Sequence, residues 1–244
     1  FCWACSNSGS DREISSPWDE ETTAQDSTAS DTANAIDDTL DKSIDSLSIL
    51  MAYERLSPTK NDRTYYPDAG IPRMLIATHS PERPDDDTTD VPAYAVITEG
   101  GAAITDTMPL MIRIRGNTSL AMPKRSFKVT FTDKVTLLDM PENRDWALLA
   151  NYGDKTLVKN YTAFKLSEWL GMAYSPRSRF VELFLNGNYR GVYQLCETIK
   201  VGKNRVNIPD NQDSYLVEVD RKYRDDEFVV INEREMAFRI HVPK

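Results

Sequence analysis

The chain has 244 residues, a formal net charge of −9 and 27% charged residues, values typical of a globular protein. No stretch approaches the ~20 apolar residues that a membrane-spanning helix needs. The overall acidity argues against non-specific binding of nucleic acid, which requires a basic surface.

The excess negative charge lies at the N-terminal end. Residues 1–50 carry 11 acidic and two basic side chains, whereas the remaining residues carry equal numbers of each. Residues 6–48 are rich in Ser, Thr, Asp and Ala, and Trp18 is their one aromatic residue. Such a segment buries too little apolar surface to offset the entropy lost on ordering. We therefore expect a disordered acidic tether over residues 1–52 and a folded domain over residues 66–244.

The first six residues, Phe1–Ser6, resemble the end of a bacterial lipoprotein signal whose charged start is missing. In that pattern a small residue, here Ala4, directly precedes the lipidated cysteine, here Cys5. The resemblance implies export and anchoring at the bacterial cell surface or outer membrane through lipid chains. The alternative is an ordinary N-terminus with two unremarkable cysteines.

The three cysteines show neither metal-ligand spacing nor a disulfide framework, and no metal site is predicted. Cys196 lies in an apolar run and is expected to be a small buried residue. His79 and His241, the two histidines, lack a partner at the spacing of a hydrolase triad.

The first predicted strands cover residues 71–78, 92–98, 111–115 and 126–132. In the last two, apolar residues alternate with polar ones, so each strand has one apolar and one polar face. If these two strands pair with their apolar faces on the core side, three cations share the other face: Arg113, Arg115 and Lys128.

The clearest helix is predicted over residues 154–170, with Asp154 as its cap and Gly171 ending it in the left-handed conformation. A β-hairpin is predicted over residues 179–199, turning at Asn186-Gly187. Residues 215–220 form a further strand, and residues 228–242 are strand-like or irregular. This order of elements predicts an α+β domain, an antiparallel sheet with one main helix.

The loop that follows Arg115 has residues suited to binding a phosphate. It offers Gly116, hydroxyl groups and backbone N–H groups between two basic strands. Residues 111–128 contain five basic residues and no acidic one. Taken alone, such a short motif is more often an ordinary turn beside a solvated basic face.

Three segments in combination resemble the CotH kinase family, which is named for spore coat protein H. The first runs from Arg113 through Gly116-Asn-Thr-Ser119 to Lys124-Arg-Ser-Phe-Lys-Val129, and the second from Trp146-Ala-Leu-Leu-Ala150 to Lys159-Asn160. The third is the hairpin from Arg179 to Glu197. The resemblance covers residues from about 70 to 220 in order.

This resemblance implies a reduced, atypical version of the protein-kinase fold, whose members transfer phosphate from ATP, with Mg²⁺, to Ser/Thr acceptors of surface or coat proteins. Residues 70–220 would be mostly the N-terminal lobe. The phosphate-facing loop would comprise Gly116, Asn117 and Ser119. Lys128 is the candidate cation for the nucleotide phosphates, with Arg115 as the competing choice.

Glu182 and Glu197 are the candidates for a carboxylate that orients the phosphate-binding lysine, as one does in ordinary kinases. The alternative is that each faces solvent on an antiparallel strand. The catalytic and Mg²⁺-binding aspartates of the family have no match here and are expected beyond Lys244. We therefore expect a fragment that carries the nucleotide-phosphate site and is inactive alone.

A second hypothesis is a non-catalytic surface lipoprotein, a pseudokinase or adhesin that binds a glycan or a protein. Such a protein would use exposed aromatic residues, for which the sequence offers Tyr65, Tyr66, Tyr94 and Tyr223. Scattered tyrosines are, however, ordinary at a protein surface or the edge of a core.

Overall fold

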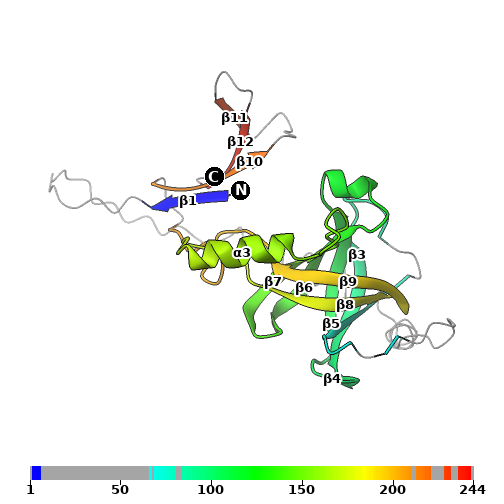
Figure 1. Ribbon diagram of the computed structural model, residues 1–244. Coiled ribbons are helices and arrows are strands. Elements are labelled where there is room, and N and C mark those ends of the chain that lie inside the picture. Colours follow the sequence, from blue (N-terminus) through cyan, green and yellow to red (C-terminus); the bar gives the residue numbers. More distant parts are fainter. Residues whose placement is uncertain are drawn as a thin grey trace, which may run out of the picture. The chain divides into compact units, whose positions relative to one another are not determined.

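The computed structural model describes residues 2–6, 66–67, 69–80, 84–209, 213–220, 228–231 and 236–242 (Figure 1). They divide into two compact units. One unit comprises the described residues of Ser27–Leu170 and Ser175–Thr198, and the other those of Phe1–Asp26, Gly171–Tyr174 and Ile199–Lys244. Apart from Cys2–Ser6, the predicted tether lies outside the described residues.

The first unit contains a closed, mixed β-barrel (Figure 1). Seven strands form it, in this order around the barrel: β2 (Arg73–Thr78), β8 (Ser178–Leu185), β9 (Asn188–Glu197), β7 (Met140–Leu149), β6 (Ser126–Leu137), β5 (Met108–Arg115) and β3 (Val91–Glu99). The barrel closes because β3, the last strand in this order, pairs with β2, the first. A two-residue strand, β4 (Ala102–Ala103), pairs with the end of β3.

The structure has one main helix among the described residues, as predicted. The predicted antiparallel direction is correct for all strand pairings around the barrel except one. The exception is β2 with β8, which run parallel, with Arg73 opposite Glu182. These two strands are far apart in the chain, and hydrophobic alternation specifies which face of a strand is buried but not which strand is its neighbour. The parallel pairing that closes the sheet was therefore not predicted.

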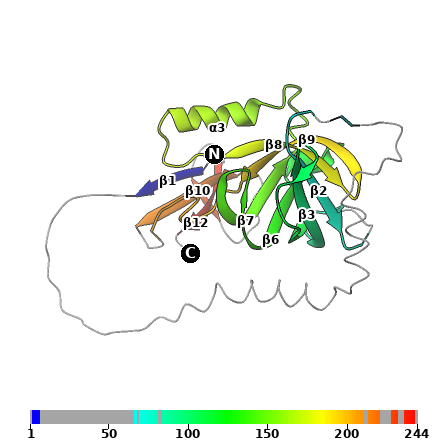
Figure 2. The same cartoon turned by 90° about the horizontal axis from the view of Figure 1, so that it is seen from below.

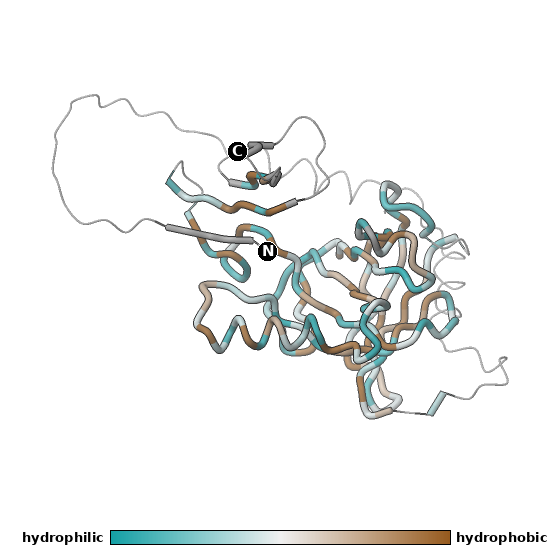
Figure 3. The backbone as a smooth tube through the Cα atoms, turned by 45° about the horizontal axis from the view of Figure 1, so that its top comes forward, coloured by the Kyte–Doolittle hydropathy of each residue, from teal (hydrophilic) through white to brown (hydrophobic). Residues whose placement is uncertain are grey.

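The barrel interior is filled by the alternating apolar residues of its strands, and Figure 3 shows hydrophobic segments recurring along them. On β5 and β6 the buried residues are those that the alternation predicted: Ile112, Ile114, Phe127, Val129 and Phe131. β7 was not predicted as a strand, because four polar residues, 142–145, interrupt its apolar pattern.

The predicted hairpin turn is confirmed. Asn186 and Gly187 both have positive φ, 51° and 74°, the backbone signature of a tight turn whose twist matches the flanking strands. The Asn186 side chain also accepts a hydrogen bond from the backbone N–H of Thr78, 2.8 Å away, at the end of β2. The turn therefore holds both β8 and the neighbouring strand in place.

The helix, α3 (Lys159–Trp169), begins five residues later than predicted. Leu157 has φ 62°, which lies outside the helical region, so the helix cannot extend back through it. Asp154 still acts on the helix start, because its Oδ2 accepts the N–H of Lys159 at 2.8 Å. Gly171 follows the helix with φ 70°, as predicted.

None of the residues of α3 is buried in the described structure. Figure 2 shows α3 as a separate helical layer beside the strands of its unit. Tyr161 contacts Phe180 of β8, with ring centroids 5.5 Å apart. Leu166 and Trp169 remain 50% and 80% exposed. No helix in the described residues has the length and hydropathy needed to cross a membrane.

The second unit contains a four-stranded sheet in the order β1 (Cys2–Ser6), β10 (Ser214–Asp220), β12 (Met236–Val242) and β11 (Phe228–Ile231). All three pairings are antiparallel. The strand predicted over 215–220 is confirmed, and the strand-like segment over 228–242 contributes two strands. Cys5 lies opposite Tyr215 in the register.

Candidate functional site

The basic face predicted from alternation is confirmed. β5 and β6 pair antiparallel, with Arg113 opposite Lys128 and Arg115 opposite Ser126. Because the intervening apolar residues fill the barrel, the three cations lie together on its outer side, each half-buried. Their ammonium and guanidinium groups therefore form one positively charged surface.

This basic face carries little compensating negative charge within the described residues. Arg113 has one ion pair, with its Nε 3.6 Å from Oδ1 of Asp90. Neither Arg115 nor Lys128 has a carboxylate within 4.0 Å in the described segments. Like charges gathered with little counter-charge repel one another, so an anionic ligand would stabilise this arrangement.

The loop after Arg115 is a tight, glycine-dependent turn. Gly116 has φ 122°, and a Cβ built at this position would lie 1.9 Å from Oγ of Ser119. The chain then forms a short 3₁₀ turn, η1 (Thr118–Ala121), in which the N–H of Leu120 donates to the carbonyl of Asn117 at 3.3 Å. Gly116 and Asn117 are exposed. The loop thus presents its backbone beside the basic face.

Glu182 is not placed to orient Lys128. Its carboxylate is bound by Arg73, whose Nε donates to Oε2 at 2.8 Å, and by the Tyr189 hydroxyl, which donates to Oε1 at 3.0 Å. Two or more strands separate β8 from β6 in either direction around the barrel. Glu182 is buried, not solvent-facing, so the simple alternative was also wrong.

Glu197 is likewise occupied elsewhere. Its two carboxylate oxygens accept the backbone N–H and the Nε of Arg177, both at 3.0 Å. It ends β9, opposite Trp146 of β7 in the register, and its side chain is fully buried. The pair joins the end of β9 to the chain entering β8.

Asn160, from the family-like Lys159-Asn160 pair, connects the helix to the barrel. Its Nδ2 donates to Oδ1 of Asn151 at 2.8 Å. Asn151 in turn donates to the buried Gln194, which donates to Ser178 at 2.9 Å. A chain of amide and hydroxyl hydrogen bonds therefore fixes the first turn of α3 relative to β8 and β9.

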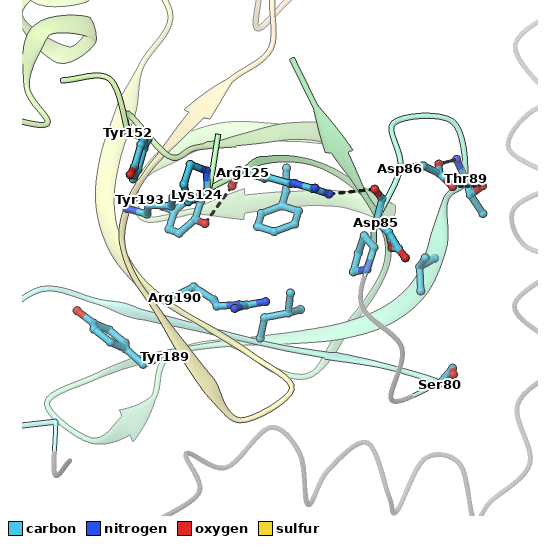
Figure 4. Close-up of a pocket in the computed structure, with 15 residues that line it drawn as sticks. Ser80, Asp85, Asp86, Thr89, Lys124, Arg125, Tyr152, Tyr189, Arg190 and Tyr193 are labelled. Atoms are coloured by element: carbon cyan, nitrogen blue, oxygen red, sulfur yellow. Dashed lines mark hydrogen bonds between the residues drawn. The ribbon is translucent and has the colours of Figure 1, made fainter. Parts of the chain in front are cut away.

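A cavity of about 1080 Å³ opens at the end of the barrel where the Gly116 loop lies (Figure 4). It is lined by three cations, Lys124, Arg125 and Arg190, and by three tyrosines, among them Tyr193. Lys124 and Arg125 belong to the family-like segment that ends at Val129, but neither was predicted to have a role of its own. Neither lies in the alternating part of a strand, so no pattern indicated where their side chains point.

Lys124 has two close neighbours at the cavity wall. Its Nζ donates to the carbonyl of Val192 and lies 4.4 Å from the centroid of the Tyr193 ring. Burial lowers the pKa of the Lys124 ammonium from its usual value. Burial also raises the pKa of Tyr193 to about 12. The Tyr193 hydroxyl therefore stays protonated and donates to the carbonyl of Arg125 at 3.0 Å.

The loop over residues 84–90 forms another wall of this cavity. Asp86 accepts hydrogen bonds from the N–H and hydroxyl groups of Thr88 and Thr89, which lower its pKa to about 2. Arg125 donates to the carbonyl of Asp85 at 3.0 Å. The Asp86 carboxylate therefore stabilises the loop from within. The hydrogen bond from Arg125 connects this loop to the start of β6.

The tyrosines suggested for a glycan or protein surface are not free platforms where the structure describes them. Tyr66 and Tyr94 are half-buried against the small apolar cluster that contains Phe184. The other two lie outside the described residues: Tyr65 and Tyr223.

The described residues contain no group of three His, Cys, Asp or Glu side chains arranged to hold a metal ion. Mg²⁺ in phosphoryl-transfer sites is usually held by one or two carboxylates together with the substrate phosphates. Within the described segments Asp90 is a carboxylate that contacts the basic face, through Arg113.

The comparison with known families identifies the family of the chain. The sequence profile of the family described as CotH kinase protein matches residues 112–237, just over half of the chain. The chain belongs to the CotH kinase protein family. The matched region begins on β5 and includes the Gly116 loop, β6, β7, α3 and the β8–β9 hairpin. No curated protein matches the chain significantly.

Membership of the CotH kinase family implies a kinase family of enzymes and, with it, the use of a nucleotide. The family resemblance inferred from the sequence is thus confirmed for the region that carries the basic face. The roles of individual residues, Lys128 and Arg115 included, stay predictions.

Proposed function

We propose that this CotH-family chain belongs to an atypical protein kinase that transfers phosphate from ATP to Ser/Thr side chains of protein substrates. The observation that supports the proposal most directly is the β5–β6 register, which gathers Arg113, Arg115 and Lys128 on one face beside the Gly116 loop. Such a site suits a polyphosphate, because catalysis of phosphoryl transfer consists mainly of positioning and of neutralising charge on phosphate oxygens.

In this proposal each residue of the site makes a different contact with the nucleotide phosphates. Lys128 places a point charge against the phosphates, and Arg115 provides a planar, multidentate donor at the end of β5. The exposed backbone of Gly116 and Asn117 supplies N–H donors close to both cations. Mg²⁺, when bound with ATP, would supply further charge neutralisation on the phosphates.

Lys128→Ala tests this assignment through Mg·ATP binding. We expect the affinity to fall by about tenfold or more, the usual effect of removing a charge-assisted hydrogen bond to phosphate. Isothermal titration on the intact protein measures the change. Lys134→Ala is the matched control, because Lys134 lies on the same strand, is exposed, and lies beyond the segment that pairs with β5.

Unchanged affinity in the Lys128 variant, with an unaltered melting temperature, would remove this residue from the site. Loss of affinity in both lysine variants alike would instead indicate a non-specific effect of net charge.

We propose separately that the protein is exported and held at a bacterial membrane surface by lipid on Cys5. The support is the signal-like sequence ending in Ala4-Cys5. Cleavage before Cys5 would remove most of β1 (Cys2–Ser6), so the lipidated form would lack the pairing of Cys2–Ala4 with β10.

Cys5→Ser is expected to leave the protein unlipidated and to move it from the membrane fraction to the soluble fraction. Mass spectrometry of the mature N-terminus checks the same point directly. A mature protein that still carries Phe1–Ala4, with an unmodified Cys5, would contradict the proposal.

A further inference from the structure

The side chain of Lys124 is a half-buried cation for which the described segments provide no ion pair. Val192 takes one of the three N–H donors of its ammonium, and the Tyr193 ring lies 4.4 Å away. In the described segments no carboxylate lies within 4.0 Å of Nζ. A partly desolvated charge without a counter-charge is unfavourable, so its retention at the wall of a cavity needs a reason.

Lys124 packs against the start of β9 at Gly191. Gly191 has φ 89°, a conformation that residues with a side chain rarely adopt. A Cβ at this position would lie 3.5 Å from Nζ and 3.6 Å from Cε of Lys124. Both distances are ordinary van der Waals contacts, so Lys124 lies directly against the start of β9, and it is the backbone conformation that favours glycine at position 191.

Two guanidinium groups and several aromatic rings complete the lining. Figure 4 shows Arg190 extending into the cavity from the wall opposite Lys124 and Arg125. Tyr152 lies on the same side of the cavity as Tyr193, whereas Tyr189 lies nearer to Arg190. The two acidic side chains that line it belong to the 84–90 loop, and Asp86 is engaged by its own threonines.

We propose that this cavity is a second anion site, which binds the phosphate group of a small organic phosphate through Lys124, Arg125 and Arg190. The cations would provide charge-assisted hydrogen bonds, and the tyrosines would contact the organic part of the ligand. A volume of about 1080 Å³ is sufficient for a ligand as large as a nucleotide.

The proposed site is separate from the basic face. Lys128 is not among the residues that line the cavity, whereas Lys124 precedes β6 and points into it. The proposal therefore does not depend on the proposed kinase function, and the two lysines can be tested independently in one experiment.

The test measures binding of inorganic tripolyphosphate by isothermal titration to the intact protein and to four variants. Lys124→Met keeps the aliphatic stem and removes the charge, and Lys124→Arg keeps the charge. Lys128→Ala reports on the basic face, and Lys134→Met controls for a lost surface charge. We expect a high-affinity binding step that Lys124→Met weakens by about tenfold or more and that the Lys128 and Lys134 variants retain.

Retained affinity in a folded Lys124→Met variant would overturn the proposal. So would one binding step lost only in the Lys128 variant, which would place the anion on the basic face. If Lys124→Met fails to fold, Lys124→Arg decides. Near-normal binding by that variant, with loss in Arg190→Gln, supports the site, and binding unaffected by Arg190→Gln overturns it.

Titrations with ATP and with phosphoserine then separate the two sources of a phosphate group. A step that depends on Lys124 with ATP but not with phosphoserine identifies a nucleotide as the ligand. The reverse identifies a phosphorylated side chain. If the affinity for ATP, phosphoserine and tripolyphosphate is in each case independent of Lys124, the assignment is overturned.

Discussion

Replacing Arg73 with methionine is expected to lower the free energy of unfolding by about 3–5 kcal/mol, the usual cost of leaving one member of a buried ion pair unpaired. The Glu182 side chain is 6% exposed and that of Arg73 is 19% exposed, with Nε 2.8 Å from Oε2. The pair also spans the parallel β2–β8 pairing that closes the barrel. Urea denaturation of the protein and of the Arg73→Met variant measures the difference.

The double variant Arg73→Met with Glu182→Gln is the informative control. It removes the unpaired charge and leaves an amide that the Tyr189 hydroxyl still reaches, so we expect it to recover much of the lost stability. A loss below about 1 kcal/mol in the single variant would show that solvent reaches the carboxylate, as in a surface ion pair.

Trp146→Ala is expected to cost a similar amount, about 3–5 kcal/mol, because it leaves a cavity in the barrel interior that its neighbours cannot fully close. Trp146 is fully buried on β7, and its Nε1 donates to the carbonyl of Asn143 at 2.9 Å. Trp146→Phe keeps most of the ring volume and should cost clearly less. Equal losses in the two variants would assign the effect to the hydrogen bond and not to packing.

These two predictions concern the scaffold, and they bear directly on the proposed site. β6 pairs with β7, and Val129, next to Lys128, lies opposite Trp146 in the register. The positions of the cations on the outer side therefore depend on a well-packed interior. By contrast, the two carboxylates once considered as partners of Lys128 act in the scaffold, since Arg73 and Arg177 bind them.

The basic face could be predicted from the sequence, whereas the cations of the cavity could not, and the reason is physical. Arg113, Arg115 and Lys128 lie within alternating strands, so the period of two already placed them on one face. Lys124 and Arg190 lie where a strand begins, and Gly191 has an unusual backbone conformation there. The direction of such side chains depends on neighbouring strands that are distant in sequence.

The sequence by itself determined the family and the local structure: the faces of β5 and β6, the turn at Asn186-Gly187 and the end of the helix at Gly171. Each depends on side-chain spacing or on the φ preference of one or two residues, and both are local properties. Only the tertiary structure decided the parallel closure of the barrel, the partners of Glu182 and Glu197, and the cavity around Lys124. These depend on contacts between residues far apart in the chain, and the energy of such contacts leaves no periodic signal in the sequence.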